Sequence, residues 1–386
     1  MSEQPAKKAK MDSLETAKSF LQEWEMPEFA KKMKNVPKHR VRLANMDTPI
    51  HRWNIPGVPD DFELYVKRDD MTGSTLTGNK IRNLEFLLGD AVVNGNESVV
   101  TCGAFTSNHC RTTAVASAQL GLDAHILIRG GGEKVPMRGN LMLSRFSGAS
   151  LYRVPDTVTD TGFYDRMVQL SNKAKATTGK GMYVIPIGGS SYPGLFGYIN
   201  CWAEMMNQGI LDRFTDIVVT CGTAVTTGAL AIANYLTGSK LRVHSFSIKR
   251  PMDFIYGYVQ ESIDLAGLDC KSEDIVSACV DYIGEGYGKN TDVELDFIRN
   301  TADTTGIFLD PVYTGKASRG MVEEMKKNPG RYKGKKVLFL HTGGIFSIYT
   351  DQRFDGVMTK EGSAADKVMY WTDGEPPMTT ILNHEQ

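Results

Sequence analysis

Short runs of β-branched and aromatic residues that are apolar on both strand faces recur along the chain and alternate with stretches of helical periodicity. Clear examples are ESVVTCG at 97–103, DIVVTCG at 216–222 and KKVLFLHTGG at 335–344. A strand that is apolar on both faces must be covered on both sides, which helices packed on a parallel sheet provide. The pattern predicts an α/β protein with open, mostly parallel twisted sheets, and 386 residues suit two lobes or one large unit.

The alternation continues along most of the chain. Further strands are expected at 63–70, 124–130, 150–154, 182–189, 240–248 and 307–310. Helical periodicity predicts helices at 79–95, 110–122, 137–148, 163–179, 198–208, 226–238 and 293–306. The Gly- and Ser-rich stretch PIGGSSYPG at 186–194 is the best candidate for a crossing between lobes.

The two ends of the chain fall outside this pattern. Residues 1–15 are expected to form a disordered tail. Within it, Lys7-Lys8-Ala9-Lys10 suits either a nuclear-import patch or a short solvated run, and the second is commoner. The segment beyond residue 350 contains Trp371 and Pro376-Pro377 and either packs on a lobe or trails from it.

Charge and cysteine usage exclude several classes of protein. The formal net charge is -1, with 44 basic and 45 acidic residues, so no strong field attracts nucleic acid or anionic lipid. No run of 18 apolar residues is present, which argues against a membrane span. The six cysteines form no CxxC pair and the seven histidines no HExxH motif. We therefore expect no metal site and a reducing, cytoplasmic location.

The segment TGSTLTGNKIRNLE at 72–85 places Lys80 where a Gly- and Thr-rich loop becomes a helix. The positive end of the helix dipole and loss of solvent both disfavour the charged form of such a lysine. A lowered pKa would make its amine nucleophilic. A solvated surface lysine is the simpler interpretation of this segment alone, and it stays open at this point.

Two further loops at strand ends suit anions. In GAFTSNHCR at 103–111, Ser107, Asn108 and His109 open a helix whose free N–H groups can bind a carboxylate, although these residue types also serve as helix caps. The segment 221–228, CGTAVTTG, lies between a strand and a helix and offers donors suited to phosphate. A tight strand-to-helix turn would explain the second loop equally well.

Two tyrosines lie in loops bounded by glycine or proline. Tyr287 follows Gly286, and Tyr313 lies in DPVYTGK at 310–316, where a ring can stack on a planar ligand or donate a proton. The segment IGEGYG at 283–288, followed later by Asp310, also suggests a dinucleotide fingerprint and thus a nicotinamide-dependent oxidoreductase. Its glycine spacing departs from GxGxxG, which makes this alternative remote.

Six segments together resemble a known family. GNKIRNLEF, GAFTSNHCRTTAVASAQLGL, VIPIGGSS, CGTAVTTG, DPVYTGKA and HTGG appear in the order typical of pyridoxal-phosphate enzymes of fold type II, which are tryptophan-synthase-β-like. The sequence is most similar to the branch of D-cysteine desulfhydrase and 1-aminocyclopropane-1-carboxylate deaminase. The likeness covers about residues 40–350.

The resemblance implies roles for the residues of these motifs. Lys80 would bind pyridoxal 5'-phosphate as a Schiff base, and Ser107 and Asn108 would hold the substrate carboxylate, Asn108 also touching the cofactor. Family members often carry glutamine where His109 stands, so its role beside the substrate is open. The remaining expected cofactor contacts are Gly222, Thr223, Ala224, Val225, Thr226 and Tyr313, with Thr227 less certain and Tyr287 as the earlier loop tyrosine.

Two positions separate the branches of the family. Deaminases carry glutamate after DPVY, beside the pyridine nitrogen, and leucine before the final Gly-Gly. Here the residues are Thr314, which the resemblance implies contacts the cofactor, and Thr342, which it implies contacts the substrate. Both resemble the residues of desulfhydrases. A neutral threonine draws less charge from the ring, which suffices when a thiolate leaves.

The sequence thus predicts a carbon–sulfur lyase that converts D-cysteine to pyruvate, ammonia and hydrogen sulfide. Lys80 would remove the α-proton, and Tyr287 would protonate the leaving sulfur. The deaminase, or another D-amino-acid ammonia-lyase, is the alternative. The resemblance further implies a homodimer, a large cofactor domain of residues 16–82 plus 199–386, and a small substrate-carboxylate domain of residues 83–198.

Overall fold

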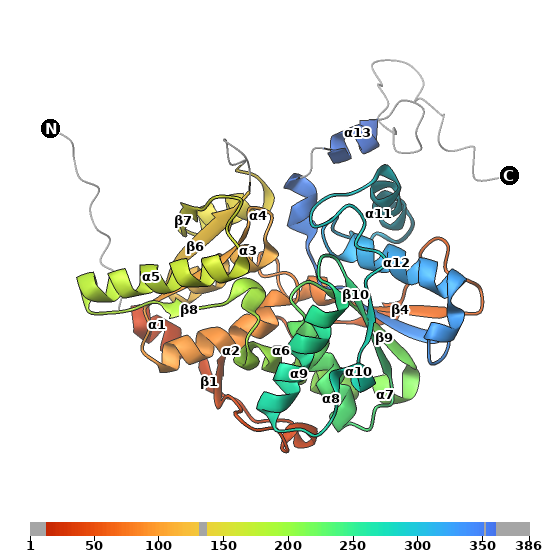
Figure 1. Cartoon of the computed structure of the whole chain (residues 1–386), viewed down its shortest axis with the longest axis horizontal. Coiled ribbons are helices and arrows are strands. Elements are labelled where there is room, and N and C mark those ends of the chain that lie inside the picture. The colour runs from red at the N-terminus through yellow and green to blue at the C-terminus, as the bar shows by residue number, and fades with distance from the viewer. Residues whose placement is uncertain (1–12, 131–136, 351–352, 360–386) are drawn as a thin grey trace, which may run out of the picture. The chain divides into compact units, whose positions relative to one another are not determined.

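A computed structural model describes residues 13–130, 137–350 and 353–359 of the chain (Figure 1). The chain divides into a unit of residues 1–350 and a unit of residues 351–386. In the second unit the described part is helix α13, Arg353–Thr359. The basic run at 7–10, Trp371 and Pro376-Pro377 lie outside the described residues.

The larger sheet of the first unit has six strands in the order β11-β10-β9-β12-β4-β3. All neighbours are parallel except β3 and β4, which pair antiparallel at the edge. Every residue of the central strand β9 is buried, as its continuous apolar run predicts. The strands span Ile50–Arg52 (β3), Glu63–Lys67 (β4), Asp216–Cys221 (β9), Arg242–Ser247 (β10), Ser277–Cys279 (β11) and Lys336–Leu340 (β12).

The smaller sheet has four parallel strands in the order β7-β6-β5-β8. They span Ser98–Ala104 (β5), Asp123–Arg129 (β6), Ser150–Arg153 (β7) and Tyr183–Val184 (β8). In Figure 1, the yellow strands β6 and β7 lie apart from the group formed by β4, β9 and β10. The predicted fold class, two lobes with mostly parallel sheets covered by helices, is confirmed. A separate ribbon pairs Leu21–Glu23 (β1) with His39–Val41 (β2).

Helices cover both sheets, and each lobe has its own buried apolar cluster. The helices span Ser13–Ser19 (α1), Lys80–Val93 (α2), Asn108–Leu120 (α3), Gly139–Phe146 (α4), Asp160–Thr178 (α5), Tyr192–Asn207 (α6), Ile210–Arg213 (α7), Val225–Leu236 (α8), Met252–Ala266 (α9), Ser272–Ile275 (α10), Asp292–Thr305 (α11) and Thr314–Lys327 (α12). None of these described helices has the length and apolarity needed to cross a bilayer.

The structure corrects four expectations about elements. Helix α1 begins at Ser13, inside the tail expected at 1–15, of which residues 1–12 lie outside the described part. The strand expected at 182–189 is only two residues long, because Pro186 and two glycines in the left-handed region follow it. The segment 307–310 forms no strand. Helices α9 and α12 lie in segments for which the sequence predicts no helix.

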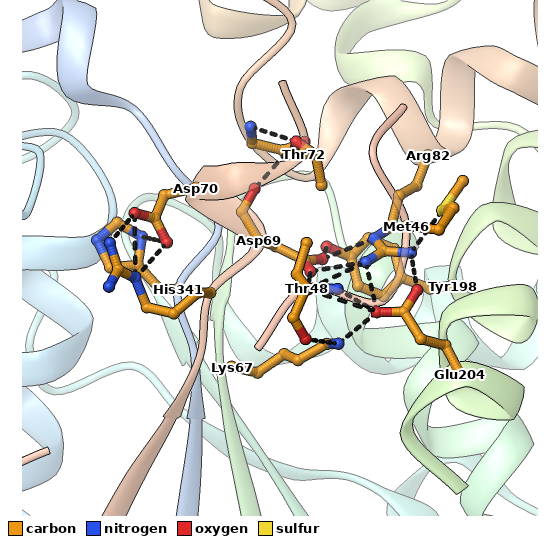
Figure 2. Close-up of polar contacts among 12 residues, drawn as sticks. Met46, Thr48, Lys67, Asp69, Asp70, Thr72, Arg82, Tyr198, Glu204 and His341 are labelled. Atoms are coloured by element: carbon orange, nitrogen blue, oxygen red, sulfur yellow. Dashed lines mark hydrogen bonds and ion pairs between the residues drawn. The ribbon is translucent and has the colours of Figure 1, made fainter. Parts of the chain in front are cut away.

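A buried charge network fixes the helix that begins at Lys80. In Figure 2, the guanidinium of Arg82 on α2 lies between the carboxylates of Asp69 and Glu204. Its nitrogens approach Asp69 twice and Glu204 once at 2.8 Å, and Lys67 also pairs with Glu204. Burial acts to raise the pKa of Asp69, but the charges of Arg82 and Lys67 and the hydrogen bonds from Arg82 and Tyr198 together outweigh it and hold that pKa below the usual range. The four charges offset one another inside the fold.

Asp69 and Glu204, with Cys201, also come close enough together to ligate a metal ion. Arg82 and Lys67 already occupy the carboxylate oxygens, so a cation would have to displace them. Burial raises the pKa of the Cys201 thiol well above its ordinary value, which disfavours the thiolate that binds metals. The cluster is better explained as a structural ion-pair network.

Candidate active site

A cavity of about 820 Å³ lies at the carboxyl ends of strands from both sheets. The loops that follow β5 and β6 line it from the smaller sheet, and those that follow β9, β10 and β12 line it from the larger one. Ligands of open α/β sheets bind at such strand ends. The predicted site residues that line it are Lys80, Ser107, Asn108, His109, Gly222, Thr223, Ala224, Val225, Thr226, Thr227, Tyr287, Tyr313 and Thr342.

Lys80 is the first residue of α2, and its Nζ donates a hydrogen bond to the carbonyl oxygen of Gly188 at 2.9 Å. Burial lowers the pKa of this amine to about 8, although the nearby Cys221 thiol acts to raise it. The preceding Gly78 has φ 104°, and a Cβ there would lie 2.7 Å from the carbonyl oxygen of Thr342. The glycine of the GNK motif therefore allows two site loops to approach each other closely.

Ser107 caps helix α3, as its residue type suggests, and its Oγ accepts a hydrogen bond from the N–H of Cys110 at 3.1 Å. Helix geometry leaves the first-turn N–H groups of Asn108 and His109 without an intrahelical acceptor. Both residues line the cavity. The start of α3 therefore offers backbone donors to an anion, as the sequence predicts.

The unpaired ring nitrogen of His109 is an acceptor, not a donor. Its Nε2 lies 2.8 Å from Thr101 Oγ1, and the Thr101 hydroxyl donates to the carbonyl oxygen of Ile185 at 2.9 Å. Because that hydroxyl has one proton, Nε2 must carry the ring proton and Nδ1 is a bare acceptor. Nδ1 is buried without a partner among the described residues, and burial lowers the pKa of the ring to about 3. The neutral ring cannot donate from Nδ1 to a carboxylate, which argues against the expected side-chain contact with substrate.

The loop after β9 enters α8 through Ala224, whose φ of 67° is rare for a residue with a side chain. The first intrahelical bond of α8 runs from the N–H of Gly228 to the carbonyl of Ala224, so the earlier N–H groups are available to a ligand. Asn79 donates to Thr226 Oγ1 at 3.1 Å and so joins this loop to the lysine loop. The arrangement suits a phosphate group.

Tyr287 and Tyr313 form a pair inside the cavity. Their hydroxyl oxygens lie 3.0 Å apart, and their rings meet edge to face at 5.9 Å. Burial raises the pKa of both phenols, so each keeps its proton at neutral pH. A Cβ on Gly222 would lie 3.2 Å from the Tyr313 ring, which places that ring against the phosphate-suited loop.

The structure brings Thr342 to the cavity but not Thr314. Thr314 is fully buried, and its hydroxyl is bonded to the Asp310 carboxylate at 2.8 Å. That carboxylate also accepts the N–H groups of Val312, Tyr313 and Thr314 and so closes the turn before α12. The expectation that Thr314 contacts the cofactor is therefore corrected. Asp310 does not end a strand, and its carboxylate oxygens already accept hydrogen bonds from the turn. It is therefore not placed to bind a ribose, as the nicotinamide alternative requires of its acidic residue.

Several lining residues were missed from the sequence. Asn79 lies in the GNK motif and Gly188 in the Gly- and Ser-rich crossing segment, so both belong to segments that are conspicuous in the sequence. Four basic residues near other strand ends also line the cavity. They belong to no recognisable motif, so the sequence gives no signal that would identify them: Arg129, Lys249, Arg250 and Lys289.

These residues fit pyridoxal phosphate on structural grounds. The loop at the start of α8 supplies free N–H groups for a phosphate, and the Tyr313 ring lies against that loop. Lys80 supplies a partly neutral amine for the aldehyde. All three open on one cavity, which also includes the anion-binding start of α3.

Comparison with known proteins gives the same result. The chain matches a family model described as "Pyridoxal-phosphate dependent enzyme" over residues 41–343. It is 39% identical over 331 residues to the mitochondrial "Bifunctional D-cysteine desulfhydrase/1-aminocyclopropane-1-carboxylate deaminase" of Arabidopsis thaliana, covering 84% of this chain and 82% of that protein. It is 34% identical to the D-cysteine desulfhydrase of Yersinia enterocolitica, covering 80% of this chain and 95% of that one.

A solved structure titled as an ACC deaminase homologue superposes with a TM-score of 0.75 and 32% sequence identity, covering 86% of this chain and 99% of that one. The match thus extends over both sheets and the cavity between them. The chain belongs to the family of pyridoxal-phosphate-dependent enzymes.

Proposed function

We propose that this pyridoxal-phosphate-dependent lyase eliminates the β-thiol of D-cysteine. One D-cysteine and one water would give one pyruvate, one ammonia and one hydrogen sulfide. The observation that carries the proposal is the amine of Lys80, with a pKa of about 8, between an anion-binding helix start and a phosphate-suited loop. When bound, the cofactor supplies the sink for the electron pair left on the α-carbon.

Residues of the cavity would bind the substrate and transfer the protons of the reaction. Ser107 and the first N–H groups of α3 would bind the substrate carboxylate and so orient the α–H bond. The neutral amine of Lys80 would take the α-proton, since an amine with a pKa near neutrality is an effective base. The proton for the leaving sulfur would come from the Tyr287 hydroxyl, which stays protonated and is backed by Tyr313 at 3.0 Å. Thr342 also lines the cavity and is proposed to contact substrate.

A substrate assay tests the proposal directly. Purified protein loaded with cofactor should absorb visible light and release equal amounts of sulfide and pyruvate from D-cysteine. Lys80→Ala should lose both the visible band and the activity. A native protein that gains neither colour nor activity with added cofactor would contradict the assignment of the site.

Ring opening of 1-aminocyclopropane-1-carboxylate is the second candidate. It is favoured by the relatives that carry the deaminase name, one of which carries both names. The position of Thr314 away from the cavity removes half of the sequence argument for the desulfhydrase and leaves Thr342. Comparing kcat/KM for the two substrates decides between them, and faster turnover of the cyclopropane would favour the deaminase.

We also propose the domain division and assembly expected from the sequence. Strands β5 to β8 fall within residues 83–198 and those of the larger sheet outside it, which supports a small and a large domain. The boundaries at 82/83 and 198/199 fall inside α2 and α6, so continuous helices would connect the two. Sedimentation analysis tests the homodimer by a mass twice that of one chain, and cell fractionation tests the cytoplasmic location.

A further inference from the structure

Asn140, the second residue of α4, is buried behind the cavity and does not line it. We propose that Asn140 is a positioning residue: it holds Asn108 with its amide NH₂ group facing the cavity, as a donor for an anionic oxygen. The assignment of that oxygen to the cofactor or to the substrate carboxylate rests on the proposed function. The orientation of the amide follows from hydrogen bonds alone.

The orientation of the Asn140 amide is fixed on both sides. Its Nδ2 lies 2.9 Å from the carbonyl oxygen of Thr106, which can only accept a hydrogen bond. Its Oδ1 lies 3.2 Å from Nε of Arg111, which can only donate. Reversing the amide would place two acceptors together on one side and two donors on the other. Asn140 therefore presents Nδ2 in the direction of Asn108.

The orientation of Asn108 follows from that of Asn140. Asn140 Nδ2 donates to Asn108 Oδ1 at 2.9 Å, so the other end of the Asn108 amide carries the NH₂ group. Asn108 lines the cavity and is half-buried. With Oδ1 engaged by Asn140, its free donors are available to a ligand beside the first N–H groups of α3. An amide donor beside a helix start suits a negatively charged oxygen.

Arg111 connects Asn140 to the loop that precedes Lys80. Its guanidinium is fully buried, and its two terminal nitrogens donate to the carbonyl oxygens of Thr75 and Thr77 at 2.5 and 3.0 Å. Burial lowers the pKa of Arg111 to about 9, and no salt bridge to it is seen among the described residues. One buried pair, Arg111 and Asn140, thus connects the anion loop to the segment that leads into Lys80.

The substitution Asn140→Asp tests the proposal, because aspartate has the same shape but only acceptors. The introduced carboxylate can still accept from Arg111, but Asn108 must turn its NH₂ toward that carboxylate and present Oδ1 to the ligand. We expect about 10- to 100-fold weaker binding of the affected ligand. If the oxygen belongs to the cofactor, the apoprotein's affinity for pyridoxal phosphate falls and the visible spectrum changes without substrate. If it belongs to the substrate, KM for D-cysteine rises and the spectrum stays unchanged.

Two variants separate orientation from packing. Asn140→Ala leaves Asn108 free to turn, so we expect a smaller effect on the same ligand than in Asn140→Asp. Ser347→Ala removes only the 3.3 Å contact of Asn140 with Ser347 and should leave affinity, spectrum and KM as in the wild type. If Asn140→Asp does not fold, Asn140→Ala must still weaken binding of that ligand.

Two results would overturn the proposal: wild-type affinity and KM in Asn140→Asp, or a larger defect in Asn140→Ala than in Asn140→Asp. The second would indicate a packing role. A wild-type protein that shows no visible band with the cofactor would refute the proposed function instead, so the two failures are distinguishable.

Discussion

Lys80 shows how the surroundings of one side chain set its chemistry. The sequence predicts a lowered pKa from the helix start and from loss of solvent, and the structure supports burial as the main cause. The segment around Lys80 alone favoured a solvated lysine, since exposure of a side chain beside a loop cannot be read from local pattern. The other motifs and the family resemblance pointed instead to a lysine that binds the cofactor. The carbonyl of Gly188, more than one hundred positions away in the chain, holds the amine in the cavity.

The pH dependence of cofactor attachment follows from this pKa. Only the neutral amine attacks an aldehyde, so association of pyridoxal phosphate with the apoprotein should speed up with pH and level off above about 8. Stopped-flow absorbance at a series of pH values measures the midpoint. A midpoint near the ordinary lysine value of 10.5 would show that the amine is solvated.

At the scale of elements, helix α2 carries Lys80 at one end and packs along α6. The periodicity of its sequence predicts the helix correctly. It does not predict that residues on nearly all sides of the helix are buried. Arg82, Asp69 and Glu204 come from three separate segments, and only the tertiary structure brings their charges together (Figure 2). Charged residues far apart in sequence give no periodic pattern, so this network could not be predicted.

Removing the cation at the centre of this network should destabilise the protein strongly. Arg82→Met leaves the carboxylates of Asp69 and Glu204 buried with too few partners, and breaking such a pair costs about 3–5 kcal/mol. Urea unfolding measures the loss. As a matched control, Lys180→Ala breaks an exposed ion pair with Glu97 and should cost at most about 1 kcal/mol. Equal losses in both variants would contradict a stabilising role for the buried network.

Close packing of α6 on α2 gives a second prediction at this scale. A Cβ on Gly197 would lie 2.4 Å from the backbone of Arg82, so Gly197→Ala must push the helices apart and should cost about 1–3 kcal/mol. Gly257 of α9 is also helical but has no atom within 4 Å of such a Cβ. Gly257→Ala should therefore stabilise by about 0.4–1 kcal/mol. The same urea unfolding assay should show a lower free energy of unfolding for Gly197→Ala and a higher one for Gly257→Ala. A stabilising Gly197→Ala would refute the packing argument.

At the scale of the whole molecule, the cavity joins loops from both sheets. A cofactor that contacts both should stabilise residues 13–350 as one unit. At 100 times its Kd, a ligand that binds only the folded state adds about 2.7 kcal/mol to the free energy of unfolding. Thermal unfolding should show one transition that moves upward with added pyridoxal phosphate, and less so in Lys80→Ala. Two transitions, of which only one moves, would mean that the lobes unfold independently.

Local patterns in the chain were enough to predict the fold class and most of the loops that line the cavity. Strands that are apolar on both faces require helices on both sides of a parallel sheet, and ligand loops must then follow the strand ends, as at 103–109 and 221–228. Such features depend on neighbouring residues and are therefore visible in the sequence. Three features emerged only from the folded chain: Thr314 turns away from the cavity, the unpaired ring nitrogen of His109 is an acceptor, and Asn140 contacts Asn108. Each depends on hydrogen-bond partners that folding brings together from distant segments, or on which way a buried side chain points, and neither is encoded in periodicity.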